Sequence, residues 1–566
     1  MTLPILPPII ANVQKIITAA EMREIDRLTV EQYATPSLLL MEAAAAAALR
    51  TIAARFDDQL SGKKARILCG PGNNGGDGAA LARQLADVGV HVDVILFGHI
   101  ENTKADARTN FEAVKQLSSF KAGSAVIPSP ITFVECNSMS AWEELARPVH
   151  SYDILVDALF GTGLSRPLNG THSLVIEHLA LIRRARDRAA SAEPFIVSLD
   201  VPSGINADVE TLIGPTVIAD TTVTFTAPKP ANVLAPACFN GGELTVADIG
   251  SPAILIDDAG SQLFLIEPAD ARDWLVRTRY QQGSYKNTHG HVLVVAGSPD
   301  YSGAAALCGN AAMRSGAGLV TIATAASAQS SVAARAMAEV MITALPETDR
   351  GTISEAAAQH VLRLGSKAKV IAIGPGLTSS DERTRRFVLE VVKEATVPVV
   401  IDADGLNCLA PWPDGLSGSK KAPRVITPHP GEMLRLMGAN NKSALDDRVN
   451  TAREFATQHH VIVLLKGSRS LIAAPDGRVF VSPTGNPGLG TAGSGDTLTG
   501  LIAGFIAQDD TANVLEAVIA ALYIGGLAGD LAAAKLGMRT MVASDIREHF
   551  GDAIRSLDER GESPRH

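Results

Sequence analysis

Residues 485–500, GNPGLGTAGSGDTLTG, combine a glycine-rich loop with one carboxylate, Asp496, at the start of an expected helix. Gly493 and Gly495 lack Cβ, so backbone N–H groups can approach a phosphate closely, and the first helical turn adds the positive end of its dipole. Such a segment can bind an anion and hold a base beside it. The alternative is an ordinary glycine loop in which Asp496 is only the N-cap.

Three further strand ends in the same half are expected to share an edge with Asp496. The segment GPGL (374–377) exposes backbone amides, PHPGE supplies His429, and KGSRS supplies Lys466. Together they predict a cleft for a phosphorylated or nucleotide ligand. Taken singly, His429 could be a structural loop histidine and Lys466 a solvated strand end.

Two more aspartates of this half lie in IDADGLN, directly after an apolar run. We expect Asp402 and Asp404 to cap the turn that follows.

A second glycine cluster, GPGNNGGDG, lies between a strand and a helix in the first half of the chain. Gly70, Gly72 and Gly75 satisfy GxGxxG, and Asp93 follows about twenty residues on, so a dinucleotide-binding Rossmann fingerprint is the competing interpretation. The extra NNGGD argues against it, because a simple pyrophosphate turn does not require polar side chains crowded onto the loop.

Two neighbouring strand ends complete this second site. VDALFGTGLSRPL brings Asp157, and SLDVPSG brings Asp200 and Ser203. Together with Asn74, the side chains of Asp157 and Ser203 supply hard oxygen atoms suited to an alkali cation, while Asp200 stands free as an acid/base. Turn capping is the alternative for each aspartate taken alone.

Short apolar, β-branched runs alternate with helical stretches in both halves, which is typical of a mostly parallel sheet covered by helices on both faces. Functional residues should gather at the carboxyl ends of the strands. Residues 231–290 change to loop-like sequence with a tryptophan-containing helical stretch. We therefore place a boundary near 255–268 and predict two α/β domains, 1–255 and 268–560. The expected strand regions are 65–70, 91–97, 152–161, 194–204, 221–229, 291–298, 318–324, 368–377, 397–407, 424–432 and 461–473.

The 566-residue chain is too long for one hydrophobic core, and its 46% hydrophobic and 19% charged residues are typical of a globular protein. Fifty Lys and Arg against sixty Asp and Glu give a formal charge of −10, which argues against a generic binder of nucleic acid or anionic membranes. The five cysteines include no CxxC pair, so we expect no disulfide framework and no zinc site. We expect no membrane span, and a homo-oligomer in the cytoplasm.

The motifs of the second half resemble the ribokinase-like fold, and within it the NAD(P)H-hydrate dehydratase branch. Residues 283–321, GSYKNTHGHVLVVAGSPDYSGAAALCGNAAMRSGAGLVT, precede IGPGL, IDADGLN, TPHPGE, KGSRS and GNPGLGTAGSGDTLTG in the order of that branch. The resemblance covers about residues 270–550. One departure is GTAGSGD, where the branch has ATGGSGD, so Gly490 and Ala492 stand where Ala and Gly are usual. Ala492 should matter little unless its position needs a positive φ.

This resemblance implies that Asp496 is the acid/base at the hydrated nicotinamide and that Gly376 and His429 contact the hydrate. Asp496 would take the proton from the ring hydroxyl as its oxygen attacks a terminal phosphoryl group, and the phosphate would leave as the ring nitrogen restores the double bond. Mg²⁺ is expected with the ADP or ATP. The implied nucleotide site comprises Lys466, Gly467, Ser468, Arg469, Ser470 and Gly495.

The motifs GPGNNGGDG, VDALFGTGLSRPL, SLDVPSG and TFTAPKP of the first half resemble the NAD(P)H-hydrate epimerase family, over about residues 18–250. The family implies K⁺ held by Asn74, Asp157 and Ser203. It also implies that Asp200 assists proton and water movement at the hydrated ring carbon, which interconverts the R and S forms. Lys229 of APKP receives no role. The implied hydrate contacts are Asn73, Asn74, Gly75, Gly76, Asp77, Gly161, Thr162, Gly163, Leu164, Ser165, Arg166, Pro167 and Asp200.

The two resemblances together imply nicotinamide-nucleotide repair, with hydrated NADH or NADPH and an adenine nucleotide as ligands. Spontaneous hydration would give both epimers, a stereospecific dehydratase would remove the S form, and an epimerase would supply that form from the R form. One alternative is a ribokinase-like kinase for a sugar or hydroxymethyl-pyrimidine, with an appended regulatory domain. Another makes the first half a nucleotide-binding or protein-interaction module. A stable phosphorylated product would favour the kinase, and ligand binding without R/S exchange would favour the module.

Overall fold

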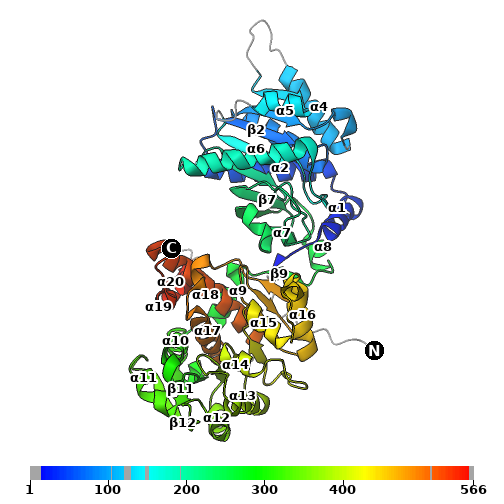
Figure 1. Cartoon of the computed structure of the whole chain (residues 1–566). Helices are drawn as coiled ribbons and strands as arrows, with labels where there is room; N and C mark the ends of the chain where they lie inside the picture. The colour runs from blue at the N-terminus through cyan, green and yellow to red at the C-terminus, as the bar shows by residue number, and fades with distance from the viewer. Residues whose placement is uncertain are drawn as a thin grey trace. The chain divides into compact units, whose positions relative to one another are not determined.

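The structure is a computed structural model that describes residues 14–103, 105–119, 129–146, 152–191, 193–509 and 513–559. The chain divides into two compact units, Lys15–Ser261 and a second that begins at Gln262 (Figure 1). A two-residue strand, β1 (Gln14–Lys15), comes first. Residues 1–13 and 560–566, which the predicted domains include in part, lie outside the described residues.

The first unit is built on a sheet in which every neighbouring pair of strands is parallel, in the order β4-β3-β2-β5-β6-β7-β8. The order reverses between β2 and β5, so the carboxyl ends of these strands form the edge where a doubly wound sheet binds its ligand. The strands are β2 (Lys64–Cys69), β3 (His91–Leu96), β4 (Ile131–Glu135), β5 (Ile154–Ala158), β6 (Phe195–Leu199), β7 (Thr221–Phe225) and β8 (Glu243–Ala247).

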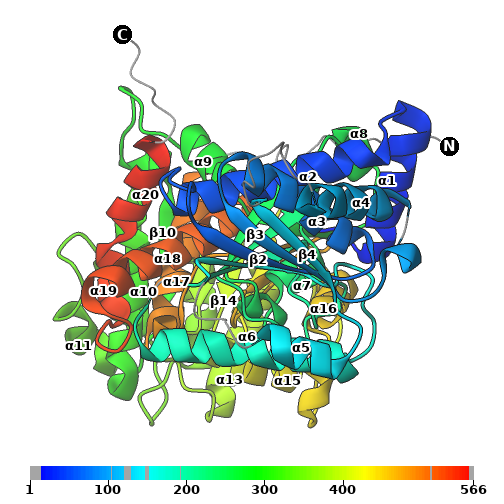
Figure 2. The same ribbon diagram turned by 90° about the horizontal axis from the view of Figure 1, so that it is seen from above.

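Helices cover both faces of this sheet: α2, α3 and α4 lie over one face and α5 and α6 over the other (Figure 2). Alternate residues of a strand therefore enter different cores, as the two-residue period of a strand requires. The helices of the unit are α1 (Ala19–Tyr33), α2 (Ser37–Arg55), α3 (Asn73–Asp87), α4 (Ala105–Ser119), α5 (Met139–Ala146), α6 (Gly170–Arg188), α7 (Pro230–Val233) and α8 (Ala253–Asp257).

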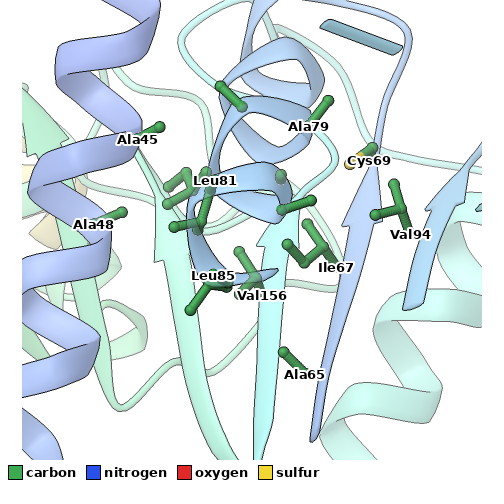
Figure 3. Packing of buried hydrophobic residues seen from close by; sticks show 14 of the residues in the cluster. Ala45, Ala48, Ala65, Ile67, Cys69, Ala79, Leu81, Leu85, Val94 and Val156 are labelled. Atoms are coloured by element: carbon green, nitrogen blue, oxygen red, sulfur yellow. The ribbon is translucent and has the colours of Figure 1, made fainter. Parts of the chain in front are cut away.

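The core between α2, α3 and the sheet is made of small and β-branched side chains. Ala45 and Ala48 of α2 face Leu81 of α3, which in turn packs over Ile67 of β2 (Figure 3). The small alanine side chains let the two helices approach each other closely, which fixes the position of α3 and of the glycine turn before it.

The second unit is also built on a mostly parallel sheet, in which β9, β18, β17, β16, β15, β14, β13, β10, β11 and β12 follow one another. Only β17 is antiparallel to both of its neighbours. The strands are β9 (Leu263–Leu265), β10 (His291–Val295), β11 (Leu319–Ala325), β12 (Met341–Leu345), β13 (Val370–Ile373), β14 (Val399–Ile401), β15 (Arg424–Ile426), β16 (Ile462–Leu465), β17 (Leu471–Ala473) and β18 (Val479–Val481).

Helix α17 is the element of the second unit that packs directly on β10, β13 and β14, with α10 and α18 beside it. The helices are α9 (Pro268–Arg277), α10 (Ser302–Arg314), α11 (Gln329–Ala333), α12 (Ala358–Gly365), α13 (Glu382–Glu394), α14 (Asp404–Cys408), α15 (Pro430–Leu436), α16 (Arg448–His459), α17 (Ser494–Gln508), α18 (Val514–Leu536), α19 (Ala543–Glu548) and α20 (Phe550–Glu559). Both units are therefore α/β, as the alternating sequence pattern predicted.

Two helices, α2 and α18, are long and apolar enough to cross a membrane by length and composition alone. In α18, 72% of the most apolar window is buried inside the unit, and α2 packs on α3. Core helices pass the same length and composition test, so the two helices are weak evidence for a membrane span.

Candidate active sites

A cavity of about 500 Å³ opens at the carboxyl edge of the first sheet. It lies between the glycine turn before α3, the loop after β5, the end of β6, and the helices α1 and α2. This is the switch-point position at which doubly wound sheets bind ligands. Eight of the predicted residues line it: Asn73, Asn74, Asp77, Gly161, Thr162, Gly163, Leu164 and Asp200.

The other predicted contacts of this unit do not line the cavity. A Cβ on Gly75 would lie 1.8 Å from the Gly70 carbonyl oxygen, and one on Gly76 would lie 2.8 Å from Cα of Ala107 in α4, so both glycines serve close backbone packing. The residues of α3 that we expected on a loop, NNGGD, form its first turns. Ser165, Arg166 and Pro167 are exposed beyond the cavity, and Asp157 and Ser203 are buried beneath it.

Asp200 follows β6 with a left-handed backbone, φ +65°. Such strain in a residue other than glycine is often found at functional sites. Its Oδ1 accepts a hydrogen bond from Lys229 Nζ at 2.6 Å, and its Oδ2 accepts one from the Thr162 backbone N–H at 3.3 Å. The sequence interpretation that Asp200 stands free was therefore wrong, because its partner lies 29 positions away, beyond β7.

Lys229, which the sequence analysis left without a role, is the partner of Asp200. Its side chain is 1% exposed, and its ammonium donates to Asp200, to Thr224 Oγ1 at 2.9 Å and to the Phe225 carbonyl at 3.0 Å. All three donors of the ammonium are thus used, which holds the charge in one place beside the Asp200 carboxylate. The apolar neighbours of a lysine in TFTAPKP gave no signal of this pairing.

Three further carboxyl groups line the same cavity, Asp26 of α1, Asp77 of α3 and Asp106 of α4. Burial raises the pKa of Asp26 to about 6, with Lys229 lowering it and Asp200 raising it. Burial, and then the charges of Asp200 and Asp26, raise the pKa of Asp77 well above its usual value. The cavity therefore holds carboxyl groups of unequal proton affinity, an arrangement suited to acid and base chemistry at one ligand. Asp26 was missed because no glycine motif surrounds it.

Of the residues predicted to hold K⁺, Asn74 lines the cavity, while Asp157 and Ser203 are buried and bond to each other. Asp157 accepts hydrogen bonds from Ser203 Oγ at 2.5 Å and from the Ser203 N–H at 2.8 Å. Asn74 is 7% exposed, and its side-chain oxygen and nitrogen have no hydrogen-bond partner among the described residues. A buried amide without a partner is costly, and a hard cation would satisfy its oxygen. The donor set therefore fits an alkali cation.

In the second unit, Asp496 lies in the first turn of α17. The N-cap of this helix is Gly493, with φ +86°, so the alternative in which Asp496 is the cap was wrong. Burial raises the pKa of Asp496 to about 7, with Asp402 raising it, Lys466 lowering it and Asp404 raising it. A carboxyl group with this pKa can take up and release a proton near neutral pH.

Asp402, at the end of β14, is 1% exposed. Its carboxylate accepts from Lys466 Nζ at 2.7 Å and from Thr499 Oγ1 of α17 at 2.7 Å, so it joins three elements and does not cap the following turn. Burial raises the pKa of Asp402, but Lys466 and the hydroxyl donors outweigh it, and the pKa is below its usual value. Asp404 accepts from the Thr378 N–H at 3.0 Å, so it too bonds to another element.

Lys466 lies directly after β16, and its side chain is 22% exposed. Burial lowers its pKa, but Asp402 and Glu432 raise it more strongly, so the pKa is above its usual value and the ammonium stays charged. Hydrogen bonds fix the rest of the loop that follows Lys466. Ser470 Oγ pairs with the Gly467 backbone, and Arg469 donates to the Pro483 carbonyl at 2.7 Å.

His429 is the N-cap of α15. Its Nδ1 accepts from the Gly431 N–H at 3.0 Å, which leaves Nε2 to carry the proton of the neutral ring. Burial, then Lys466 and Arg435, lower the pKa of His429. Its side chain is still 52% exposed, so the cap role and a contact to a ligand are compatible.

Gly376, in the loop after β13, has φ +64°. A Cβ there would lie 2.8 Å from both Tyr301 Cβ and the Tyr301 carbonyl and 3.1 Å from Ala304 Cβ, so this loop lies against the start of α10. Tyr301 is 57% exposed beside it and was not singled out from the sequence.

The departure from the usual loop sequence is compatible with the backbone. Ala492 does not have a positive φ, and a Cβ on Gly490 would meet nothing within 4 Å. Exchanging Ala and Gly at these two positions therefore creates no steric clash and no backbone strain.

Comparisons with known proteins agree with the division into two units. The family model described as NAD(P)H-hydrate dehydratase matches residues 292–550, and the one described as YjeF-related protein N-terminus matches residues 37–231. A bifunctional NAD(P)H-hydrate repair enzyme of Moorella thermoacetica is 39% identical over 548 residues, covering 97% of this chain and 98% of the relative. One from Thermofilum pendens is 35% identical over 549 residues, covering 97% and 98%.

A solved structure is also similar. The ADP/ATP-dependent NAD(P)H-hydrate dehydratase from Bacillus subtilis, co-crystallised with ATP and Mg²⁺, is 29% identical, and the match covers 52% of this chain and 98% of that chain with a TM-score of 0.44.

Proposed function

This chain belongs to the family of bifunctional NAD(P)H-hydrate repair enzymes, and from that premise we propose which unit carries each activity and which residues perform it. The enzyme epimerises the R and S forms of hydrated NAD(P)H and dehydrates the S form to NAD(P)H at the expense of ADP or ATP. The first unit is the epimerase and the second is the dehydratase. One observation carries this assignment: the family model described as NAD(P)H-hydrate dehydratase matches residues 292–550, which lie in the second unit, while the YjeF-related model matches residues 37–231 of the first.

Asp496 is the acid/base of dehydration. It takes the proton from the ring hydroxyl, whose oxygen then forms a bond to the terminal phosphorus of the nucleotide while the bond from that phosphorus to the nucleotide oxygen breaks. The ring nitrogen pushes out the new phosphate, and loss of a proton from the adjacent carbon restores the double bond. The pKa of about 7 suits this role, because Asp496 is then about half ionised at pH 7 and largely ionised above it.

The nucleotide is ADP or ATP and would bind with Mg²⁺, which would neutralise part of the phosphate charge. Lys466 to Ser470 and Gly495 line the nucleotide site, while Gly376 and His429 contact the hydrate. The loop bonds of Arg469 and Ser470 support this proposal, because they hold the backbone in a fixed shape that can receive a nucleotide.

Asp200 is the acid/base of epimerisation. Lys229 keeps its carboxylate in one orientation, with Oδ2 toward the glycine loop that holds Thr162. The hydrate contacts are the residues that line the cavity, and Asp77 is the carboxyl group best able to donate a proton there. Asn74, Asp157 and Ser203 would hold K⁺, which would supply positive charge that fixes the two glycine turns around the ligand.

The experiment uses the full chain with mixed R and S hydrates of NADH and either nucleotide. The returning dihydronicotinamide absorbance and the released inorganic phosphate are measured together, and the epimers are separated by chromatography. Wild-type enzyme should consume both epimers. Asp496→Asn should lower the dehydration rate by about 10²–10⁴-fold and leave R/S exchange intact. Asp200→Asn should consume S-hydrate at the normal rate and leave R-hydrate.

Normal dehydration by Asp496→Asn would remove that residue from the mechanism, and normal consumption of R-hydrate by Asp200→Asn would remove Asp200. A stable phosphorylated product without regained absorbance would identify a kinase instead.

We also propose that the enzyme is a cytoplasmic homo-oligomer with no nucleic-acid or membrane partner. The excess of acidic over basic residues supports the proposed absence of nucleic-acid and membrane partners. Light scattering in solution measures the assembly, and fractionation measures the location.

A further inference from the structure

The Asp402 carboxylate is buried in the dehydratase unit and is not used by the proposed mechanism. It is 1% exposed, and its two oxygens accept from different elements, Oδ1 from Lys466 after β16 and Oδ2 from Thr499 in α17, both at 2.7 Å. A buried carboxylate is expensive unless it is fully paired. The two bonds of Asp402 therefore connect Lys466 to α17, through Thr499 in the second turn of that helix.

The backbone at Gly495 lies next to the Lys466 ammonium. A Cβ on Gly495 would lie 3.3 Å from Lys466 Nζ and 3.5 Å from Asp402 Oδ2. The residue just before Asp496 is therefore in contact range of both members of the ion pair. The ammonium is at the glycine turn, where helix-start amides would meet a phosphate.

The titratable groups near Asp496 lie in or directly after four elements, β14, α14, β16 and α10. Asp402 and Asp404 raise its pKa, Lys466 lowers it, and the buried Cys308 thiol of α10 lies close enough for Asp496 to affect its pKa. Lys466 is the cation of this group, and its flexible side chain has four rotatable bonds, so something must hold it in place.

We propose that Asp402 is a positioning residue for dehydration, which holds the Lys466 ammonium against the first turn of α17 so that this cation meets the phosphoryl group passing to the hydrate. This rests on the proposed function of the unit. Lys466 then acts at the transferred phosphoryl group as well as in the nucleotide site. Charge spreads over the equatorial phosphoryl oxygens during transfer, and a fixed cation there stabilises the transition state more than the bound nucleotide.

A double-mutant cycle on the full chain tests the proposal, with Asp402→Asn, Lys466→Met and the combined variant measured with S-hydrate and ATP. Each single variant should lower kcat about 10²-fold. In Asp402→Asn, which keeps the ammonium, the KM for ATP should change by no more than about threefold, because the positioned cation matters most in the transition state. Asp402→Asn should cost little further when Lys466 is already methionine, since Asp402 acts through Lys466. Removing both charges together also avoids an unpaired buried ion, so the combined variant should fold.

Lys466→Met provides a second readout that a purely structural role would not change. Lys466 lowers the pKa of Asp496, so the midpoint of the acidic limb of the kcat profile should move above pH 7 in this variant. The matched control is Asp476→Asn, which removes an exposed carboxylate paired with Arg478 and should keep the wild-type kcat and midpoint.

Three results would each overturn the proposal. The first is that the losses of kcat in the two single variants add up in the combined variant, the second is a wild-type kcat in Asp402→Asn, and the third is a change confined to the KM for ATP. An unchanged thermal unfolding transition of each variant reports that the second unit is folded, since epimerisation reports only on the first unit. Failure of the wild-type enzyme to regenerate NADH would overturn the proposed function itself, which is a different result from normal regeneration by Asp402→Asn.

Discussion

The carboxyl groups of Asp496 and Asp200 have different electrostatic environments. Asp496 has no direct cation partner among its described hydrogen bonds and has a pKa of about 7, set by burial and by the nearby Asp402. Asp200 is instead paired directly with Lys229 at 2.6 Å. A base that must accept a proton from a hydroxyl group benefits from the higher proton affinity that burial gives. The two carboxylates are therefore suited to different steps of repair.

The pKa of Asp496 predicts how dehydration depends on pH. The residue acts as a base, so only its ionised form is active, and kcat should fall about tenfold for each pH unit below 7 and level off above it. The measurement is kcat for S-hydrate at saturating nucleotide between pH 5.5 and 8.5. A flat profile below pH 7 would contradict the assignment of Asp496 as the base.

The sequence could predict the residues that lie inside glycine motifs, and the structure places Asn74, Asp77 and Asp200 on one cavity and Lys466, Gly495 and Asp496 together in the other unit. It could not predict partners that are distant in the chain. The bond from Lys466 to Asp402 spans 64 positions and depends on the order of the strands, which no local pattern encodes. For that reason Asp402 was interpreted as a turn cap.

At the scale of the elements, the close packing of α17 on α10 fixes the position of Asp496. A Cβ on Gly500 would lie 2.1 Å from the Cys308 carbonyl, and one on Gly504 would lie 1.8 Å from Ser315 Oγ, so only glycine lets the two helices meet at this distance. Asp496 is one turn before Gly500 on the same helix. The helix crossing therefore sets the height of the carboxylate above the sheet.

Apolar runs predicted most of the strands, because parallel strands buried on both faces are apolar along their whole length. Strand β8, within residues 231–290, was missed because only Ala247 is fully buried in this edge strand and its sequence, ELTVA, carries no continuous apolar run. The run 461–473 was taken as one strand, but KGSRS turns the chain, and β16 and β17 pair antiparallel. Strand β9 pairs with β18, although it precedes residue 268, where we expected the second domain to begin.

Arg424 of β15 joins its strand to the end of α13. Its side chain is 4% exposed and donates to the carbonyl oxygens of Val392 at 2.8 Å, Ala395 at 2.9 Å and Ala422 at 2.7 Å. Burial lowers its pKa to about 10, so it stays charged at neutral pH. Arg424→Met should remove these bonds and lower the free energy of unfolding by about 3 kcal/mol, seen as a drop in Tm of roughly 6–10 °C.

The control is Arg386→Met on α13, where the side chain is 58% exposed and its ion pair with Glu355 is on the surface. This change should alter the free energy of unfolding by no more than about 0.5 kcal/mol. Equal Tm values for the two variants would show that the buried bonds of Arg424 do not stabilise the unit.

At the scale of the whole molecule, each unit has its own sheet, core and paired aspartate and lysine. The two proposed sites share no residue. The two activities should therefore be separable by single substitutions, and the hydrate released by one site should be a normal substrate for the other.

The most direct test mixes Asp200→Asn and Asp496→Asn enzymes in equal amounts and follows R- and S-hydrate with ADP or ATP. Asp200→Asn alone should leave R-hydrate, and Asp496→Asn alone should exchange the epimers but regenerate almost no NADH. The mixture should consume both epimers completely, because each variant supplies the site that the other lacks. Persistence of R-hydrate in the mixture, with each variant active in its remaining reaction, would contradict two self-contained sites.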